Sequence, residues 1–237
     1  MQLPALTEGI LIKRYKRFLA DVDFGGTVET VHCPNPGAMT GLKDPGSRVW
    51  CSTSDNPKRK LKKTLELVES GGVLVGINTN LPNKLVQEAL TEKIIPAFAP
   101  YPEITPEFTY TKGTRFDFRV AAPDGRAMMI EVKNVHLARP DGPNPGAMEF
   151  PDSVTARGAK HLRTLAEIAR RGEPAAMLYV IQRGDGEYFT LADDIDPAYA
   201  EAYIDAHEAG VEMHAWRCDI TTSAITITEP VSINYGG

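Results

Sequence analysis

The feature that most constrains the fold is a pair of alternating segments on either side of one turn, within residues 114–135. The turn has the sequence Ala-Pro-Asp-Gly, whose residue types favour a tight reversal of the chain. A period of two on both sides of such a turn predicts a β-hairpin. The alternating apolar residues are Phe116, Phe118, Val120, Ile130 and Val132.

Charged side chains fill the alternate positions of the same hairpin. If the hairpin is symmetric about Asp124, Asp117 lies directly opposite Glu131, and Lys133 follows on the same face. Two facing carboxylates repel one another, so their juxtaposition needs a reason. A divalent cation is the simplest one, because Mg²⁺ prefers oxygen ligands from one or two carboxylates. The alternative is an ordinary solvated strand face, on which a Glu-x-Lys pair is common.

Length and composition describe a globular protein. The 237 residues allow one large domain or two of ordinary size. Three cysteines without metal-binding spacing indicate a reducing compartment. We expect no signal peptide and no membrane span, because the basic N-terminal region and the later chain lack a long apolar run. The expected location is therefore the cytoplasm.

Residues 1–80 have the pattern of a small β-barrel. Four short strand-like runs are separated by Gly- and Pro-containing turns. Short strands at regular spacing are typical of small barrels, and an OB-like barrel fits the size. The four runs, the first of which is expected to be one long strand, cover residues 10–22, 27–33, 48–52 and 73–77.

Basic side chains gather in two places within this first domain, at residues 13–17 and 58–63. The net charge of −5 does not exclude a nucleic-acid partner, because residues 184–237 alone hold one basic residue against 11 acidic ones. Lys and Arg neutralise phosphates, and the interleaved Tyr15 and Phe18 offer stacking surfaces. Either cluster alone is more typical of a solvated face, but two clusters on one small barrel favour a surface that binds a nucleic-acid backbone.

Residues 81–237 predict an α/β domain with a mixed sheet. A short helix is expected over 83–90, capped by Asn80 or Asn83, and an irregular Pro-rich link follows it up to the hairpin. A longer helix is expected to begin near Asp152 or Ser153 and to end at Gly172. Its buried stripe includes Val154 and Gly158, and Gly158 predicts close approach to a neighbouring element. Arg157 and Lys160 fall on one flank, with His161 at the edge of the stripe. The remaining expected elements are a buried strand at 176–182, a helix at 197–209, and strands at 224–228 and 230–233.

These residues carry a known pattern. Asp117 followed by Glu131-x-Lys133, after a helix bearing Glu88, resembles the core of the PD-(D/E)xK nucleases. The chain as a whole resembles the sugar fermentation stimulation protein A family, although Pro36 and Ala38 stand where threonine and serine are usual. The matching segments are residues 14–22, 32–39, 81–86, 117–118, 131–133 and 150–162.

The resemblance implies an N-terminal OB-like domain, residues 1–80, and a C-terminal domain like the restriction endonucleases, residues 81–237, in an α+β protein overall. It also implies DNA binding and a link to regulation of sugar (maltose) metabolism. Catalysis would use Asp117, Glu131 and Lys133, and Mg²⁺ or Mn²⁺ would be held by Asp117, Glu131 and Glu88. The residues expected to contact DNA are Lys13, Arg14, Arg17, Lys58, Arg59, Lys60, Arg157, Lys160 and His161.

Three functions stay open at this point. The first is a DNA-binding protein with metal-dependent nuclease activity. The second is a DNA-binding regulator whose nuclease fold is catalytically silent. The third is an enzyme acting on small phosphorylated sugars, although the chain lacks a Gly-rich phosphate-binding motif. The oligomeric state is open too, with a homodimer among the options.

Overall fold

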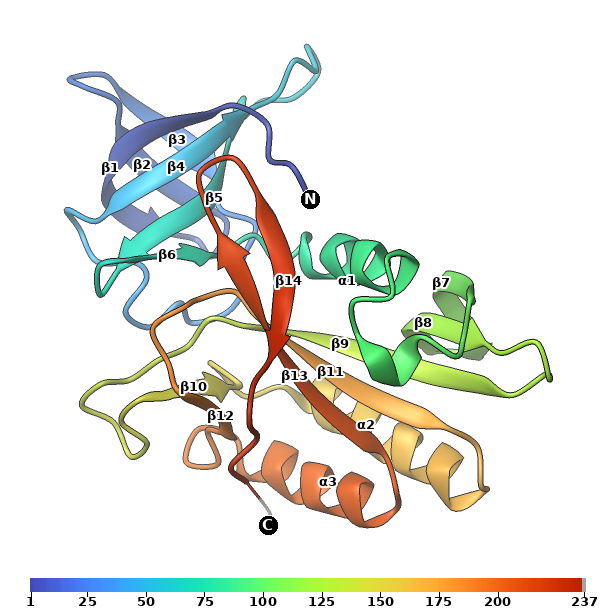
Figure 1. The fold of residues 1–237 in the computed structure, drawn as a ribbon. Coiled ribbons are helices and arrows are strands. Elements are labelled where there is room, and N and C mark those ends of the chain that lie inside the picture. The colour runs from blue at the N-terminus through green and yellow to red at the C-terminus, as the bar shows by residue number, and fades with distance from the viewer. Residues whose placement is uncertain (236–237) are drawn as a thin grey trace.

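The computed structural model describes residues 1–235. The chain forms an N-terminal barrel and a C-terminal layered domain, arranged as in Figure 1. The barrel sheet has the order β3-β2-β1-β4-β5-β6 and is closed by pairing of β3 with β5, which agrees with the predicted OB-like domain. Its strands are β1 (Leu6–Tyr15), β2 (Leu19–Asp23), β3 (Val28–His32), β4 (Arg48–Thr53), β5 (Lys63–Ser70) and β6 (Val73–Gly76).

Two barrel strands differ from the prediction. The single long strand expected over residues 10–22 is a hairpin, because the chain turns between β1 and β2. Lys16 and Arg17 adopt positive φ angles of 48° and 64° in that turn, a conformation that is uncommon outside glycine and that their side chains do not signal. Strand β5 was not predicted, and its run of buried residues begins directly after the second basic cluster.

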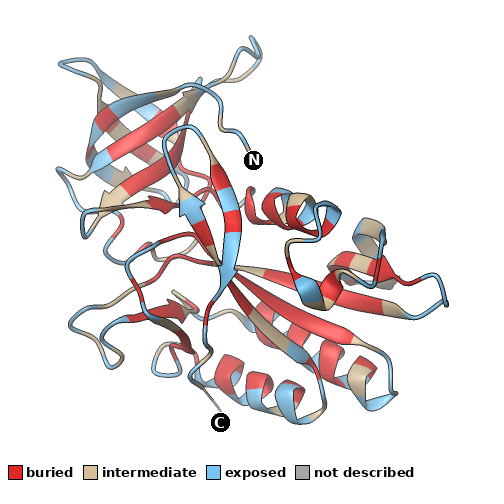
Figure 2. Ribbon diagram, viewed as in Figure 1, coloured by how far each residue is buried: buried red, intermediate tan, exposed pale blue. Residues whose placement is uncertain are grey.

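The C-terminal domain contains a six-stranded mixed sheet with the order β14-β13-β11-β9-β8-β7. β11 is parallel to both β9 and β13, and it is buried along its whole length (Figure 2). The sheet strands are β7 (Glu103–Thr111), β8 (Thr114–Ala121), β9 (Ala127–Val135), β11 (Ala175–Ile181), β13 (Glu212–Ile220) and β14 (Ile225–Pro230). A separate small parallel pair consists of β10 (Ala147–Phe150) and β12 (Tyr188–Leu191).

Helices cover both faces of this sheet (Figure 1). α1 (Pro82–Thr91) packs on one face, in an apolar core with Phe118, Ile130 and Val132. α2 (Ala156–Arg170) and α3 (Pro197–Glu208) pack on the other face, in a second core with Phe116 and Met129. A one-turn 3₁₀ helix, η1 (Pro96–Phe98), follows α1. None of the helices within residues 1–235 is long and apolar enough to cross a membrane.

Several expectations for this domain were wrong in detail, including the two strands expected at 224–228 and 230–233, where the structure has the single strand β14. The link before the hairpin contains a regular strand, β7, which tolerates Pro106 because it lies at the edge of the sheet. Thr155 caps α2, accepting a hydrogen bond from the Gly158 N–H at 3.1 Å, while Asp152 makes contacts elsewhere. Val154 precedes the helix and is 74% exposed, so it is not part of the buried stripe.

The two domains pack against one another at the C-terminal ends of β9 and β11. Trp50 and Leu67 of the barrel join the same apolar core as α1. The Gly76 N–H donates to the Gln182 carbonyl at 2.9 Å, and a Cβ on Gly76 would lie 2.4 Å from the Gln182 side-chain oxygen. A glycine is therefore what allows this close approach. The barrel consequently sits beside the end of the hairpin that carries the candidate site.

Candidate metal centre

The hairpin of β8 and β9 has the predicted register. Phe118 pairs with Ile130 and Ala121 pairs with Ala127, which is symmetric about Asp124. The pairing of β8 with β9 ends at Phe118. Phe116 packs in the α2–α3 core, although Phe118 packs in the α1 core. The strand therefore twists at Asp117 as it leaves β9. Asp117 sits in the fork between the two strands, and the predicted direct pairing with Glu131 is not formed.

The Asp117 carboxylate is fixed by two donors. Its Oδ2 accepts a hydrogen bond from the main-chain N–H of Val132 at 2.8 Å, and its Oδ1 accepts one from Asn83 at 2.7 Å. Burial raises the pKa of Asp117 above its ordinary value, and the nearby charge of Glu131 raises it further. Asp117 and Glu131 are therefore close enough to interact electrostatically. The backbone N–H that holds Asp117 belongs to Val132, the residue after Glu131.

Glu131 is buried, with 4% of its surface exposed. Its Oε1 accepts from Lys133 Nζ at 2.5 Å and from His161 Nδ1, which comes from α2. Burial alone would raise the pKa of Glu131, but the charges and hydrogen bonds of Lys133 and His161 outweigh burial and lower it. Its other oxygen, Oε2, is buried and has no hydrogen-bond partner within residues 1–235.

The packing of α2 brings His161 to this carboxylate. Gly158 lies one turn before His161, and a Cβ there would approach Tyr199 of α3 to 3.0 Å, so the predicted close contact at this glycine is present. The His161 ring also packs edge-on against Phe116, with ring centroids 6.1 Å apart. Sequence reasoning placed His161 among the phosphate contacts, whereas in the structure its Nδ1 serves Glu131.

Glu88 does not join Asp117 and Glu131, which corrects the predicted ligand set. Its carboxylate binds the N-terminal ammonium of Met1 at 2.9 Å. Asn83 is the α1 residue that reaches Asp117, and five residues of helix turn Glu88 about 140° away from it. Across residues 1–235, no three His, Cys, Asp or Glu side chains cluster as a metal-binding group.

Asn83 is the residue of this site that sequence reasoning missed. It was interpreted as a candidate helix cap, yet Leu81 is the N-cap residue and makes no side-chain cap. The Asn83 amide is thereby available for Asp117. The only signal in the sequence was a polar residue at the start of an amphipathic helix, and the same signal is typical of an N-cap residue.

The predicted basic residues fall into separate groups. Arg157, Lys160 and His161 line a hollow of about 460 Å³ together with Arg115, and His161 links this hollow to Glu131, which does not itself line it. Arg14 instead donates to the carbonyls of Asn35 and Gly37, so it holds the barrel together.

The remaining predicted contacts lie on the barrel. Lys13 pairs with Asp21 at 3.5 Å, and Arg59 donates to Thr64 at 2.6 Å. Lys58 and Lys60 are exposed in the loop between β4 and β5. Arg17 is exposed in the β1–β2 turn and lines a different pocket, between the domains.

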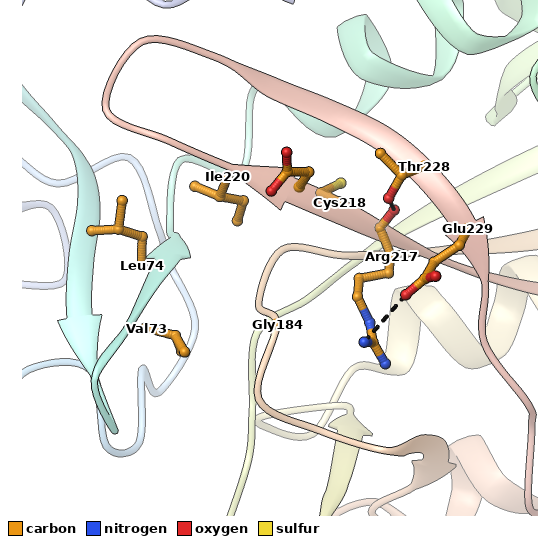
Figure 3. A pocket seen from close by; sticks show the side chains of 9 residues that line it. Val73, Leu74, Gly184, Arg217, Cys218, Ile220, Thr228 and Glu229 are labelled. Carbon is orange, nitrogen blue, oxygen red and sulfur yellow. Dashed lines mark hydrogen bonds and ion pairs between the residues drawn. The ribbon is translucent and has the colours of Figure 1, made fainter.

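A further hollow of about 610 Å³ lies between β6 and the β13–β14 hairpin (Figure 3). Arg217 points towards Glu229 there, with the two charged groups 3.3 Å apart, and Val73 and Leu74 face them from the barrel. None of the predicted site residues lines this hollow. Its size alone therefore does not connect it with the carboxylate site.

Comparison with known proteins identifies the family. Residues 80–224 match the model described as "Sugar fermentation stimulation protein RE domain", and residues 12–77 match the model described as "SfsA N-terminal OB domain". The chain belongs to the sugar fermentation stimulation protein family. The two matched segments correspond to the layered domain and the barrel.

Curated members of this family resemble the chain over nearly its whole length. A sugar fermentation stimulation protein homolog of Jannaschia sp. is 49% identical, over 99% of this chain and 97% of its own. The homolog of Maricaulis maris is 46% identical, over 98% of each chain. A solved structure, described as Pyrococcus furiosus SfsA in complex with Ca²⁺, has a TM-score of 0.87 at 22% identity and covers 99% of this chain and 98% of its own. That likeness establishes the shared fold.

Proposed function

We propose that this protein binds DNA and hydrolyses its phosphodiester bonds with the help of a divalent cation. The observation that carries the proposal is Glu131 Oε2, a buried carboxylate oxygen without a hydrogen-bond partner among the described residues. Leaving such an oxygen unsatisfied is costly, so it calls for a missing partner. A cation is a suitable partner, because the oxygen belongs to a carboxylate beside Asp117.

The donor set fits Mg²⁺ or Mn²⁺ better than a cation that needs an all-protein cage. Two carboxylates are available, from Asp117 and Glu131, and phosphate and water complete the shell that Mg²⁺ prefers. The Pyrococcus furiosus protein of the same fold is described as a complex with Ca²⁺, which also takes oxygen ligands. When bound, the cation would supply charge that polarises a phosphate oxygen and acidifies a water molecule.

The chain's own side chains would hold the cation and position the attacking water. Glu131 Oε2 and Asp117 would hold the cation, and the Val132 N–H and Asn83 keep the Asp117 carboxylate in place. The Lys133 ammonium, 2.5 Å from Glu131 Oε1, would orient the attacking water. His161 would keep Glu131 ionised and correctly rotated by donating to the same oxygen.

Cationic side chains near this centre support a phosphate-bearing substrate. Arg157 and Lys160 border the hollow beside His161, where they would neutralise charge that develops on the phosphate. Lys58 and Lys60 project from the barrel loop and would contact the DNA backbone.

The barrel contact has its own test. Replacing both Lys58 and Lys60 with Ala should weaken DNA binding equally for all sequences. Loss of about two phosphate contacts should reduce the slope of log affinity against log salt by about 2. Fluorescence anisotropy over a salt series measures the slope. An unchanged slope would leave these lysines as solvated surface.

A second candidate has one observation in its favour. Lys133 and His161 both bind Glu131 Oε1, so part of the carboxylate charge is balanced without any cation. The protein would then be a binding-only regulator of sugar (maltose) metabolism, in keeping with relatives that are named for the stimulation of sugar fermentation. Its buried ion pairs would serve stability alone.

A cleavage assay separates the two candidates. Labelled single-stranded, duplex and branched DNA are incubated with Mg²⁺ or Mn²⁺ and the protein, with Lys133→Ala and the exposed helical Lys84→Ala as matched variants. We expect the wild type and Lys84→Ala to cut at least one substrate. Lys133→Ala should bind DNA but not cut it. Absence of cleavage on all substrates in protein free of contaminating nuclease, with Lys133→Ala chiefly less heat-stable, would favour the binding-only candidate.

A further inference from the structure

The two domains enclose a second pocket, of about 330 Å³, at the C-terminal end of β9. Arg17 and Pro36 line it from the barrel side. His136, Phe150 and Val154 line it from the layered domain. The pocket volume is at the lower end of the range found for small-molecule sites.

The wall between the domains is rigidly built. His136 is buried and donates from Nε2 to Asp152 Oδ2 at 3.2 Å, and its Nδ1 accepts from Asn134 at 2.9 Å. Asp152 also accepts the main-chain N–H of Met39 from the barrel at 3.2 Å. A Cβ on Gly37 would lie 2.2 Å from Asp152, so this glycine permits the contact between domains. The pocket is therefore formed before any ligand arrives.

Three chain segments connect this pocket to the carboxylate site. Asn134 lines the pocket and directly follows Lys133 on β9. Thr79 lines it too and lies four residues before Asn83, which binds Asp117. Thr155 lines it and caps the helix that carries His161. The pocket and the carboxylates therefore lie near the same end of β9.

We propose that this pocket binds one unpaired nucleotide of a nucleic-acid strand, next to the phosphate held at the carboxylate site. The assignment rests on the proposed nuclease function and gives it a substrate class, namely single-stranded ends or segments. A base within a duplex is stacked and paired, so it must leave the helix to enter a pocket of this size.

The lining has the chemistry that a nucleotide needs. Pro36, Phe150 and Val154 offer apolar surface to a base, and aromatic contact with bases tolerates any sequence. Arg17 brings a guanidinium to the phosphate, and within residues 1–235 it has no acidic partner. Asn134 uses one amide hydrogen on His136 and keeps the second for a base or sugar oxygen.

Mononucleotide binding tests the proposal without any need for cleavage. The full chain in EDTA is titrated with dAMP, AMP, ribose 5-phosphate and inorganic phosphate, and binding is followed by protein NMR. We expect dAMP and AMP to bind and to shift the signals of residues lining the pocket. Ribose 5-phosphate and phosphate should bind at least about tenfold more weakly, because they lack the base.

Two variants and a matched control locate the site. Val154→Glu places a negative charge at the pocket, and Arg17→Asn removes the guanidinium while tolerating the positive φ of that position. Arg17→Asn should weaken dAMP binding about tenfold, the usual effect of losing one charge-assisted contact. Val154→Glu should weaken it by about as much, because its carboxylate repels the phosphate and removes apolar surface from the base. Val28→Glu makes the same change at an exposed barrel valine and should have no effect.

The outcomes separate the pocket from the nuclease function. Equal dAMP affinity in Val154→Glu and Val28→Glu, or equal affinity for ribose 5-phosphate and dAMP, would overturn the nucleotide assignment even if DNA is cut. No dAMP binding at all would overturn it too. Pocket-specific dAMP binding without cleavage of any DNA would support the pocket and count against the nuclease function.

Discussion

Two buried glutamates in this protein have opposite surroundings. Glu149 is 1% exposed, and both of its oxygens are satisfied: Arg139 binds them with two hydrogen bonds of 2.7 Å, and Asn144 adds a third at 2.9 Å. Glu131 is 4% exposed, yet Lys133 and His161 share one of its oxygens, and the other has no partner among residues 1–235.

The difference separates a structural carboxylate from a candidate ligand. A carboxylate that serves stability alone is expected to have both oxygens hydrogen-bonded, as Glu149 does. Arg139 extends that network to Asp194 at 2.7 Å, so three charges are tied together. At Glu131, Lys133 and His161 both bind Oε1, which leaves Oε2 available to bind a cation. Burial alone does not distinguish the two residues, but the partners of each oxygen do.

The largest expected effect comes from breaking the hydrogen-bond network of Glu149 and Arg139. Glu149→Gln would point an amide N–H at the Arg139 guanidinium and remove its charge partner, costing about 3 kcal/mol of unfolding free energy. Glu131→Gln should cost less, about 1 kcal/mol, because the cost of burying the Glu131 charge cancels most, but not all, of its pairing with Lys133 and His161. Thermal unfolding at neutral pH should show a melting temperature lower by roughly 6–12 °C in the first variant only. Equal losses would mean that Glu131 is structural too.

A smaller effect of opposite sign is expected at two aspartates. The pKa of Asp117 is raised, so its ionisation costs stability as the pH rises through that pKa, and Asp117→Asn should be more stable than the wild type at neutral pH. Burial would raise the pKa of Asp152, but His136 and other hydrogen bonds lower it to about 2. Asp152→Asn should therefore be less stable at neutral pH.

Denaturant titrations at several pH values measure both aspartate effects. The stabilisation by ionised Asp152 is complete above about pH 4 and fades as the pH falls towards 2. The advantage of Asp117→Asn should vanish below about pH 4, where the wild-type carboxyl is protonated in both states. If both variants change stability in the same direction at neutral pH, the contrast between the two aspartates fails.

The sequence was sufficient for the parts of the fold that depend on local pattern. Alternation and turn chemistry gave the register of the hairpin about Asp124, and apolar periodicity with a stop at Gly172 gave α2. The barrel was recognisable from short strands between turns. The edge strand β7 was hidden because its Pro106 is also typical of irregular chain.

The arrangement of the site depended on geometry that periodicity does not contain. Alternation assigns a face only while a strand stays regular, and β8 twists between Phe116 and Phe118. Helical spacing cannot say which side of α1 meets the hairpin, so Glu88 was selected where Asn83 lies. His161 was found as a residue, but its partner Glu131 was not, because that contact depends on how α2 packs against the rest of the domain, including its close approach to Tyr199 of α3 at Gly158.

Calorimetric titration with Mg²⁺, Mn²⁺ and Ca²⁺ tests the central claim most directly, using the wild type, Asp117→Asn, Glu131→Gln and Glu149→Gln at a temperature where all are folded. The account predicts one site in the wild type, retained in Glu149→Gln and lost in both Asp117→Asn and Glu131→Gln. Cation binding that survives Glu131→Gln, or no binding of any of the three cations to the wild type, would contradict the assignment of Glu131 Oε2 as a ligand.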